Sequence, residues 1–447
     1  MAVTGWFVLL VAVGVVPVIA LDGAFGGGWV FLAWTAVCIL LAVVDVALAA
    51  SPRAARLERS SADRVRLTES AVATLLVTNP SGRRMRGIVR DAWEPSAGAR
   101  PTRQRLDVPA GERRAITTTL TPWRRGERRS AAVTIRAIGP LRLAGRQASI
   151  LVPGAITVLP EFASRKHLPS RLARLRELDG RTSVMVRGQG TEFDSLREYV
   201  RGDDVRSIDW RATARRGGEP AGSGAAGPAQ TLMVRTWRPE RDRRVVMIVD
   251  SGRTAAARIA NETRLDTAFE STLLLSALAD RAGDRVDVAI FDRRVRGRVQ
   301  GARGADLLAK LTETMAPIDP ELLETDWSAV PALVRSMTAQ RSLVVIATPL
   351  ESPGSTRSLL AMLPQLTRTH LVLIAAVTDP ELIDATRDRS DRTAVYRAAA
   401  AERALLDAER VAAAVKRLGG DVVSAAPLDL PPAVSDRYLA YKAAGRL

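Results

Sequence analysis

The sequence predicts a multidomain membrane protein with an N-terminal transmembrane helical hairpin, an antiparallel β-sandwich and a C-terminal α/β domain. Two long apolar runs open the chain, short alternating apolar runs follow between turn residues, and strand-like and helix-like segments then alternate to the end. The length of 447 residues is enough for two or three domains. We place the hairpin at 1–52, the sandwich at 53–160, a linking segment at 161–242 and the α/β domain at 243–447.

The composition excludes several classes of site. Cys38 is the single cysteine, and His167 and His370 are the only histidines, so neither a cysteine-based nor a histidine-rich zinc site can form. No phosphate-binding loop of the Gly-x-x-x-x-Gly-Lys-Ser/Thr type occurs. The net charge of +17 comes mostly from arginines spread along the chain. Because they form no basic helix or aromatic-interleaved stripe, we expect no nucleic-acid binding.

The hairpin prediction rests on two runs long enough to cross a membrane. The first, Trp6–Leu21, has no charged residue, and the second, Trp29–Ala50, has only Asp45. A helix needs about 20 apolar residues to span the hydrocarbon core. A cleaved signal peptide is the alternative for the first run, but no basic residue precedes it.

The orientation follows from basic residues beside the second run. Five arginines come directly after it, whereas the turn between the runs has neither Lys nor Arg; the arginines are Arg53, Arg56, Arg59, Arg64 and Arg66. The positive-inside rule places this flank and the remaining chain in the cytoplasm, so we expect a cell-membrane protein with cytoplasmic soluble domains. Asp45 could pair with a partner helix, but we favour contact with lipid headgroups because it lies near the inner end.

The region 53–160 alternates apolar and polar residues with period two. Clear examples are Ala71–Thr78, Ala115–Leu120 and Ala131–Arg136, separated by turn residues such as Asn79-Pro80-Ser81-Gly82. This pattern is typical of an immunoglobulin-like β-sandwich. It contains no cluster of catalytic side chains, which indicates a role in spacing or in protein contact.

The most distinctive segment runs from Gly188 to Arg215. It mixes glycines, ion-pairing residues and aromatic anchors, and its candidate binding or structural residues are Gly188, Gly190, Glu192, Phe193, Arg197, Glu198, Tyr199, Gly202, Asp203, Asp204, Arg206, Asp209, Trp210 and Arg215. Asp203 or Asp204 is predicted to cap a short helix. The segment could dock a partner, or its ion pairs could fix a domain boundary.

This string resembles the signature of the bacterial domain of unknown function 58. The likeness extends to the Pro122–Gly126 turn and to Tyr438–Lys442 near the end of the chain, whereas an insertion at 217–230 departs from the family pattern. The resemblance implies a membrane-tethered partner of MoxR-type AAA+ ATPases that carries a von Willebrand A-like, Rossmann-type domain. It implies no defined biochemical activity.

The C-terminal region reads as alternating strands and helices. The predicted strands are Val245–Val249, Val286–Phe291, Leu343–Ala347, Leu371–Val377 and Asp421–Ser424. The main predicted helices are Arg264–Ala282 and Ala394–Leu418. We therefore expect a mainly parallel sheet with helices on both faces and a binding edge beyond the carboxyl ends of its strands.

Asp250 follows the first of these strands, where the von Willebrand A family binds a metal ion. That family uses Asp-x-Ser-x-Ser, a Thr and a further Asp. Here Asp250, Thr254 and Thr325 match, but Gly252 and Pro349 replace a hydroxyl and a carboxylate, and Ser251 should point elsewhere. Glu351 or Asp326 could substitute. Mg²⁺ demands near-ideal oxygen geometry, so the site is degenerate and no cofactor is expected.

These observations favour a non-enzymatic adaptor or scaffold that works with a MoxR-type ATPase in cell-envelope or protein-complex maturation. The main alternative is a metal-ion-dependent adhesion module that binds a protein ligand through the α/β domain. An unrecognised hydrolase stays open, although no catalytic constellation is visible. The client protein and the oligomeric state do not follow from the sequence.

Overall fold

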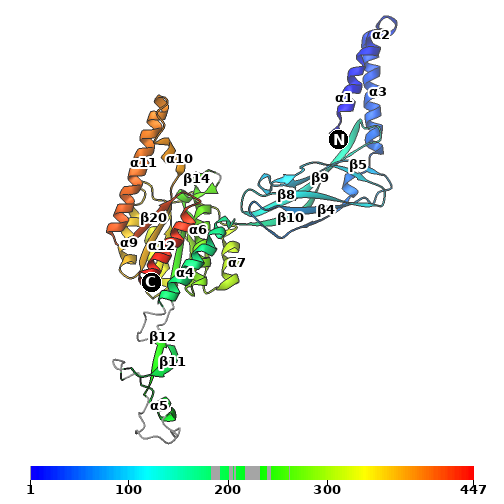
Figure 1. The fold of residues 1–447 in the computed structure, drawn as a ribbon. Helices are drawn as coiled ribbons and strands as arrows, with labels where there is room; N and C mark the ends of the chain where they lie inside the picture. Colours follow the sequence, from blue (N-terminus) through cyan, green and yellow to red (C-terminus); the bar gives the residue numbers. More distant parts are fainter. Residues whose placement is uncertain are drawn as a thin grey trace. The chain divides into compact units, whose positions relative to one another are not determined.

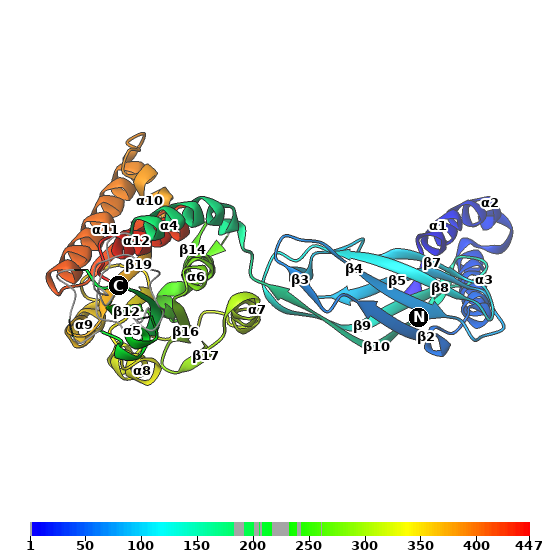
Figure 2. The same ribbon diagram turned by 60° about the horizontal axis from the view of Figure 1, so that its bottom comes forward.

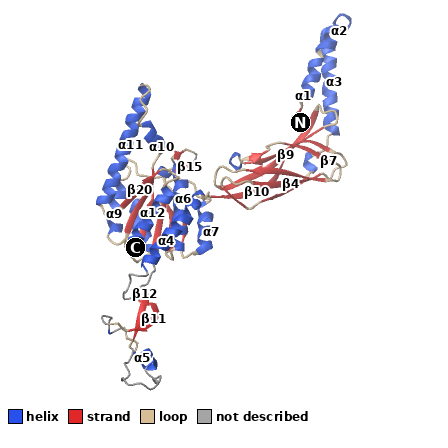
Figure 3. Ribbon diagram, viewed as in Figure 1, coloured by secondary structure: helices blue, strands red, loops and turns tan. Residues whose placement is uncertain are grey.

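The structure is a computed structural model that describes residues 2–182, 192–200, 205, 208–216, 232–238, 243–260 and 262–447. The chain divides into two compact units, the first formed by residues 1–161 with 312–318 and the second by 162–311 with 319–447. The first contains the N-terminal helices and a region of strands, and the second mixes helices and strands (Figure 3).

The N-terminal helices are α1 (Gly5–Val13), α2 (Val15–Phe25) and α3 (Gly27–Leu48) (Figure 1). By length and composition, Gly5–Phe25 and Gly27–Ala54 are candidate membrane spans with mean hydropathies of 2.4 and 2.5. The 22 residues of α3 rise about 33 Å, enough to cross a hydrocarbon core of about 30 Å. The two helices therefore fit membrane association of the chain.

Asp45 does not contact lipid headgroups, contrary to the prediction. Its side chain is fully buried near the end of α3, and its carboxylate accepts hydrogen bonds from the backbone N–H groups of Leu141, Leu143 and Ala144. The reason is that the loop between two strands of the neighbouring sandwich folds over this end of the helix. Sequence periodicity alone does not reveal that contact.

Two sheets form the sandwich, antiparallel except for the parallel pair of β3 with β10, and the long strands of one sheet can be followed in Figure 2. That sheet has the order β1-β10-β9-β5-β7, with β3 pairing on β10: β1 (Ala2–Val3), β3 (Arg64–Arg66), β5 (Met85–Trp93), β7 (Gln104–Val108), β9 (Gly126–Ile138) and β10 (Ala144–Leu159). The other sheet has the order β2-β4-β8-β6: β2 (Arg56–Ser61), β4 (Ala71–Thr78), β6 (Ala99–Arg100) and β8 (Arg113–Leu120). Short helical turns η1 (Pro52–Ala54) and η2 (Pro95–Ala97) complete it.

Alternation along the strands builds the sandwich core. In β4 the side chains of Ala71, Ala73, Leu75 and Val77 point inward and are buried, while their neighbours are more accessible. They pack with inward residues of the other sheet, such as Ile135. Period-two patterning therefore sets both the register and the buried face.

The second unit is built on a six-stranded sheet with the order β17-β16-β13-β18-β19-β20. All pairs are parallel except β17 on β16. The strands are β13 (Arg244–Asp250), β16 (Arg285–Phe291), β17 (Val295–Val299), β18 (Leu343–Ala347), β19 (Leu371–Val377) and β20 (Asp421–Ala425). The antiparallel edge strand β17 was not predicted, because two of the five residues in its sequence Val-Arg-Gly-Arg-Val are basic.

The helices of this part of the chain are α4 (Leu168–Thr182), α6 (Arg264–Arg281), α7 (Gly304–Met315), α8 (Val330–Met337), α9 (Arg357–Thr367), α10 (Pro380–Ala385), α11 (Arg392–Arg417) and α12 (Leu430–Ala443). Of these, α6, α9, α11 and α12 contact this sheet directly. Shorter elements are η3 (Ala163–His167), η5 (Arg253–Ala256), η6 (Trp327–Ala329) and the hairpin β14 (Arg258–Ile259) and β15 (Glu262–Thr263).

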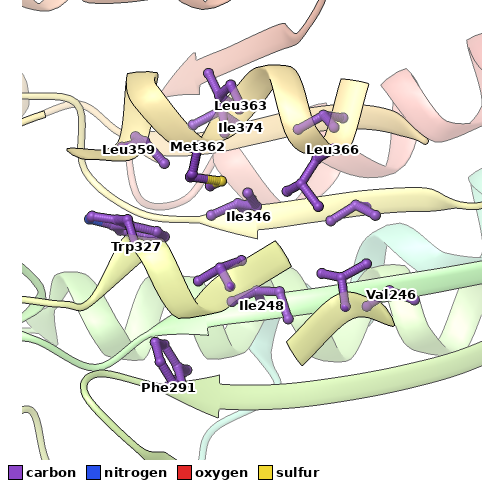
Figure 4. Close-up of a cluster of buried hydrophobic side chains, with 14 of the residues drawn as sticks. Val246, Ile248, Phe291, Trp327, Ile346, Leu359, Met362, Leu363, Leu366 and Ile374 are labelled. Atoms are coloured by element: carbon purple, nitrogen blue, oxygen red, sulfur yellow. The ribbon is translucent and has the colours of Figure 1, made fainter. Parts of the chain in front are cut away.

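Side chains alternate between the two faces of the parallel sheet. Val246, Ile248 and Ile346 belong to a buried cluster with Trp327 and Met362, from η6 and α9 (Figure 4). Met247 points the other way, where the hydroxyl of Ser276 on α6 lies 3.7 Å from its sulfur. With both faces covered, the inner strands β18 and β19 are apolar throughout, as the continuous Val/Ile/Leu runs indicate.

Between α4 and β13 the second unit contains β11 (Glu192–Glu198), paired antiparallel with β12 (Met233–Arg238), and α5 (Trp210–Arg216). The helix begins after Asp209, whose carboxylate accepts from the N–H groups of Arg211 and Ala212. Asp209 is thus the cap of this helix. The predicted capping residues Asp203 and Asp204 lie outside the described residues.

Candidate functional site

The carboxyl edge of the parallel sheet places several polar residues next to one another. β13 ends at Asp250, β16 is followed by Asp292, and β18 is followed by Thr348. The loop before η6 joins them, because Glu321 N–H donates to the Ser251 carbonyl and Arg253 N–H donates to the Leu323 carbonyl, both at 2.8 Å. Neighbouring parallel strands thus bring together residues far apart in the sequence.

Asp250 is the centre of this edge and is only 2% exposed. Its carboxylate accepts from Gly252 N–H at 2.9 Å, from the Thr348 hydroxyl at 2.7 Å and from the Thr325 hydroxyl. The Thr254 hydroxyl lies farther away, at 3.4 Å. Three hydroxyls and one amide therefore surround a single carboxylate and satisfy its oxygens from within the protein.

Burial raises the pKa of the Asp250 carboxyl above its ordinary value. Hydrogen bonds from Thr325, Gly252 and Thr348 act in the opposite direction but do not cancel the effect of burial. No arginine or lysine forms an ion pair with this carboxylate among the described contacts. The charge is thus balanced by dipoles alone, which makes its ionised form costly in a dry interior.

The structure brings the three predicted residues Asp250, Thr254 and Thr325 together and adds Thr348. Thr348 was not among the predicted site residues, because the metal-binding pattern has its carboxylate one position later, where Pro349 stands. The signal was nevertheless present, since Thr348 directly follows a strand that is buried along its whole length. A hydroxyl at that point must lie at the carboxyl edge beside Asp250.

Gly252 is sterically required at the position where the metal-binding pattern has serine. A Cβ atom on Gly252 would lie 2.2 Å from the Thr325 hydroxyl oxygen and 2.9 Å from the Leu323 carbonyl oxygen. Both distances are shorter than van der Waals contact allows. The Thr325 hydroxyl therefore fills the space into which a side chain at 252 would extend. The hydroxyl of the neighbouring Ser251 donates instead to Asp292 at 3.2 Å.

Asp292 forms a second polar cluster beside the first. Burial opposes its ionisation, but hydrogen bonds from Arg296 and from the N–H groups of Arg293 and Arg294 together outweigh it, so the pKa of Asp292 is lowered. The Arg296 guanidinium lies 2.9 Å from Asp292 and 2.8 Å from Glu321. Asp292 is thus an ionised anchor for the surrounding loops.

The donor set around Asp250 does not fit a magnesium ion. Of the two proposed substitutes, Glu351 pairs with Arg264 at 2.6 Å, and Asp326 caps η6 by accepting from Ser328. Within the described residues no group of three or more His, Cys, Asp or Glu side chains could hold a metal. One carboxylate with three neutral hydroxyls leaves the charge and the octahedral geometry of Mg²⁺ incomplete.

The cavity beside Asp250 is about 10 Å³, room for about one water molecule and not for a substrate. Outside it, the loops of this edge carry exposed apolar side chains. Leu322 is 76% exposed, Leu428 74% and Leu323 44%. Arg253 pairs with Glu324 at 2.7 Å on the same loops. We call these exposed leucines the leucine rim: Leu322 and Leu323 come from the loop before η6, and Leu428 comes from the loop after β20, at the same carboxyl edge of the sheet.

A comparison with protein-family models indicates which family this chain resembles. Residues 195–383 match the family model described as "Protein of unknown function DUF58". This match supports the resemblance of the chain to the DUF58 family. No curated protein matches the chain. The matched range contains Asp250, Thr325 and Thr348, so the polar edge of the sheet lies within the DUF58 region.

Similar solved structures include the CARDB domain of a Pyrococcus furiosus protein in complex with di-metal ions, 17% identical over 23% of this chain and 91% of that domain, with a TM-score of 0.18. A Listeria innocua β-glucosidase is 14% identical over 23% of this chain and 16% of its own length, with a TM-score of 0.17. A Vibrio harveyi GH20 exo-β-N-acetylglucosaminidase is 11% identical over 83% and 75%, with a TM-score of 0.21. These scores are too low to support any conclusion about fold or activity.

The segment Gly188–Arg215, which resembles the DUF58 signature, is only partly within the described residues. Gly188, Gly190, Gly202, Asp203, Asp204 and Arg206 lie outside them. Glu192, Phe193, Arg197 and Glu198 are on β11, with Tyr199 directly after it, and Asp209, Trp210 and Arg215 are at or in α5. Trp210 is 66% exposed, so it is not the buried anchor that was predicted, whereas Ile208 nearby is buried.

The C-terminal part of the DUF58 resemblance has a structural explanation. On α12, the Tyr438 hydroxyl donates to Asp284 at 2.5 Å, and Lys442 pairs with Asp284 at 3.1 Å. The Tyr441 hydroxyl donates to Asp421 at 2.6 Å. Burial, followed by this hydrogen bond, raises the pKa of Tyr441, so the hydroxyl keeps its proton. These contacts fix α12 on the sheet.

Proposed function

We propose that this protein is a membrane-anchored adaptor whose von Willebrand A-like domain binds a protein partner at the leucine rim. The observation that carries the proposal is the closed Asp250 site. Its carboxylate is satisfied by the protein's own hydroxyls, and the cavity beside it is about 10 Å³. What this edge offers to another molecule is therefore its outer surface.

The rim has the composition of a protein-binding surface. Leu322 and Leu428 are each about three-quarters exposed, and the ion pair Arg253–Glu324 lies next to Leu322 and Leu323 in the chain or on the loop that follows β13. Exposed leucines surrounded by charged residues are typical of binding patches, where desolvation of a few apolar side chains provides most of the affinity. Asp250 and its hydroxyls then serve to hold these loops in place.

We further propose that the partner is a MoxR-type AAA+ ATPase and that the protein acts in cell-envelope or protein-complex maturation at the cytoplasmic face of the membrane. The support is the DUF58 match together with two candidate membrane spans at the N-terminus. The positive-inside distribution of arginines after the second span supports a cytoplasmic orientation.

Binding of a purified MoxR-type ATPase to the full chain in lipid nanodiscs tests this proposal. The double variant Leu322→Asp/Leu428→Asp places charge on the rim and is expected to weaken binding at least about tenfold. Leu151→Asp is the matched control, because Leu151 is 82% exposed on β10 and lies in the other unit. Equal affinity of the rim variant and the control would contradict docking at the rim.

A second variant separates the rim from the DUF58 signature as the docking surface. Arg197→Ala/Asp204→Ala/Arg206→Ala changes only signature residues. If the partner binds the rim, the triple variant keeps its affinity while the rim variant loses it. The reverse result would assign docking to the signature. If both variants kept full affinity for the partner, neither surface would be the docking site.

A further inference from the structure

The turn between β9 and β10 is tied to both ends of the membrane hairpin. At one end, Asp45 Oδ1 accepts from Leu141 N–H at 2.7 Å, and Asp45 Oδ2 accepts from the N–H groups of Leu143 and Ala144 at 2.8 and 2.9 Å. At the other end, Thr4 directly precedes α1, and its N–H and hydroxyl both donate to the Leu143 carbonyl at 3.0 Å. The turn is therefore held where the chain enters and leaves the hairpin.

A close approach of backbone and side chain makes this connection tight. A Cβ atom on Gly139 would lie 2.2 Å from Asp45 Oδ1 and 2.3 Å from the Asp45 carbonyl oxygen, so only glycine fits. The last carbonyls of α3 are also bound, since Arg83 donates to the Ala47 carbonyl at 2.6 Å and Arg146 to the Val46 carbonyl at 2.9 Å. Such carbonyls otherwise lack partners at a helix end.

The position of Asp45 in α3 sets the depth of the turn. Asp45 is three residues before the end of the helix at Leu48, which is less than one helical turn or about 5 Å. The helix is about as long as the hydrocarbon core is thick. A turn hydrogen-bonded to Asp45 therefore lies at the level of the lipid headgroups when α3 spans the bilayer.

The exposed tip of the turn has the chemistry of that layer. Pro140 and Arg142 are exposed, and Leu141 is 48% exposed. An apolar side chain next to a guanidinium suits the boundary between acyl chains and phosphates, because the leucine enters the apolar side while the arginine reaches the phosphate layer. An arginine near an anionic membrane is attracted to the negative surface potential of the headgroups.

We propose that the Pro140–Arg142 turn is a membrane-contact site, in which Leu141 enters the headgroup boundary and Arg142 binds anionic phospholipid headgroups. This inference rests on the membrane anchoring in the proposed function. The turn would give the protein a second, specific lipid contact besides the hairpin. It would also hold the attached end of the sandwich at a fixed height above the bilayer.

Spin labels on the full chain in nanodiscs measure the depth directly. In a Cys38→Ala background, single labels replace Leu141, Ile39 or Leu151, and their accessibilities to oxygen and to a water-soluble nickel complex are compared. Ile39 is 55% exposed in the middle of α3 and reports on anchoring; Leu151 is 82% exposed on β10, about 26 Å along the strand from Leu143, and is the control away from the turn. We expect Ile39 deep, Leu141 at headgroup depth and Leu151 in water.

The possible outcomes distinguish failure of the membrane-contact site from failure of the membrane anchor. A deep label at 39 with a fully aqueous label at 141 overturns the membrane-contact site and leaves the anchor standing. An aqueous label at 39 overturns the anchor and the contact together. Asp45→Asn weakens the connection, so the label at 141 should then lose its defined depth.

The association of spin-labelled phosphatidylglycerol, relative to phosphatidylcholine, tests the role of Arg142. Arg142→Gln is expected to lower the relative association constant up to about fivefold. Arg129→Gln is the control, because Arg129 is 68% exposed on β9 and lies nine residues, about 30 Å, from Ile138. Equal lipid selectivity in both variants would overturn headgroup binding by Arg142.

Discussion

Asp250 shows how a buried carboxylate can be held without a counter-ion. Thr325, Thr348 and the Gly252 amide each donate to it, and no described side chain brings a positive charge into direct contact. In this arrangement each hydroxyl matters, because removing one leaves a lone pair of a buried anion without a partner. The cost of such a loss exceeds the usual gain from making one hydrogen bond.

Thr348→Val tests this dependence. The substitution keeps the shape of the side chain but removes the donor to Asp250, and we expect it to destabilise the α/β unit by about 1–3 kcal/mol. Faster hydrogen exchange in β13 and β18 measures the change. Thr369→Val is the control, because Thr369 is exposed in the same unit, and an equal effect of both variants would contradict the assigned role of Thr348.

The pH dependence of stability gives a second test at Asp250. Because burial raises its folded pKa, the folded state takes up a proton more readily than the unfolded chain. The contribution of this group to stability is therefore greatest below its ordinary pKa of about 4 and is lost as the pH rises through the folded pKa. Asp250→Asn should remove this component, seen as a flatter pH profile of the unfolding free energy. An unchanged profile would show that Asp250 ionises normally.

The elements of the fold could be predicted well where periodicity determines them. The runs at Val245–Val249, Leu343–Ala347 and Leu371–Val377 are strands, and the predicted Arg264–Ala282 helix ends one residue earlier than expected. Edge strand β17 was missed, because an edge strand with one exposed side needs few apolar residues. The position of Thr348 could have been predicted from the strand before it, whereas the contacts of Asp45 could not, since they depend on which loop lies opposite after folding.

Helix α12 provides a test at the scale of an element. Lys442 and Tyr438 both hold Asp284, whose side chain is 2% exposed. Lys442→Met leaves a buried carboxylate without its cation and should cost about 3–5 kcal/mol. Adding Asp284→Asn to that variant removes the unpaired charge and should restore much of the stability, measured by denaturant unfolding of the chain in detergent. No recovery in the double variant would mean that Lys442 acts mainly through packing.

At the scale of the whole molecule, the proposed orientation predicts which residues face each side of the membrane. Phe25 lies at the end of α2 and is 69% exposed. In intact cells, a Phe25→Cys variant should react with a membrane-impermeant maleimide, whereas Leu151→Cys should react only after permeabilisation. Both variants carry Cys38→Ala. Labelling of Leu151→Cys in intact cells would reverse the orientation and exclude a cytoplasmic ATPase partner.

The Asp45 connection also determines how mechanical load would travel. A pull on the sandwich reaches α3 through the hydrogen bonds of Leu141, Leu143 and Ala144 as well as through the covalent chain. Parallel bonds share tension, so the helix end would resist unravelling until all three yield. If an ATPase applied a pulling force to this protein, the force would therefore act on the hairpin as a single unit and would not unfold it residue by residue.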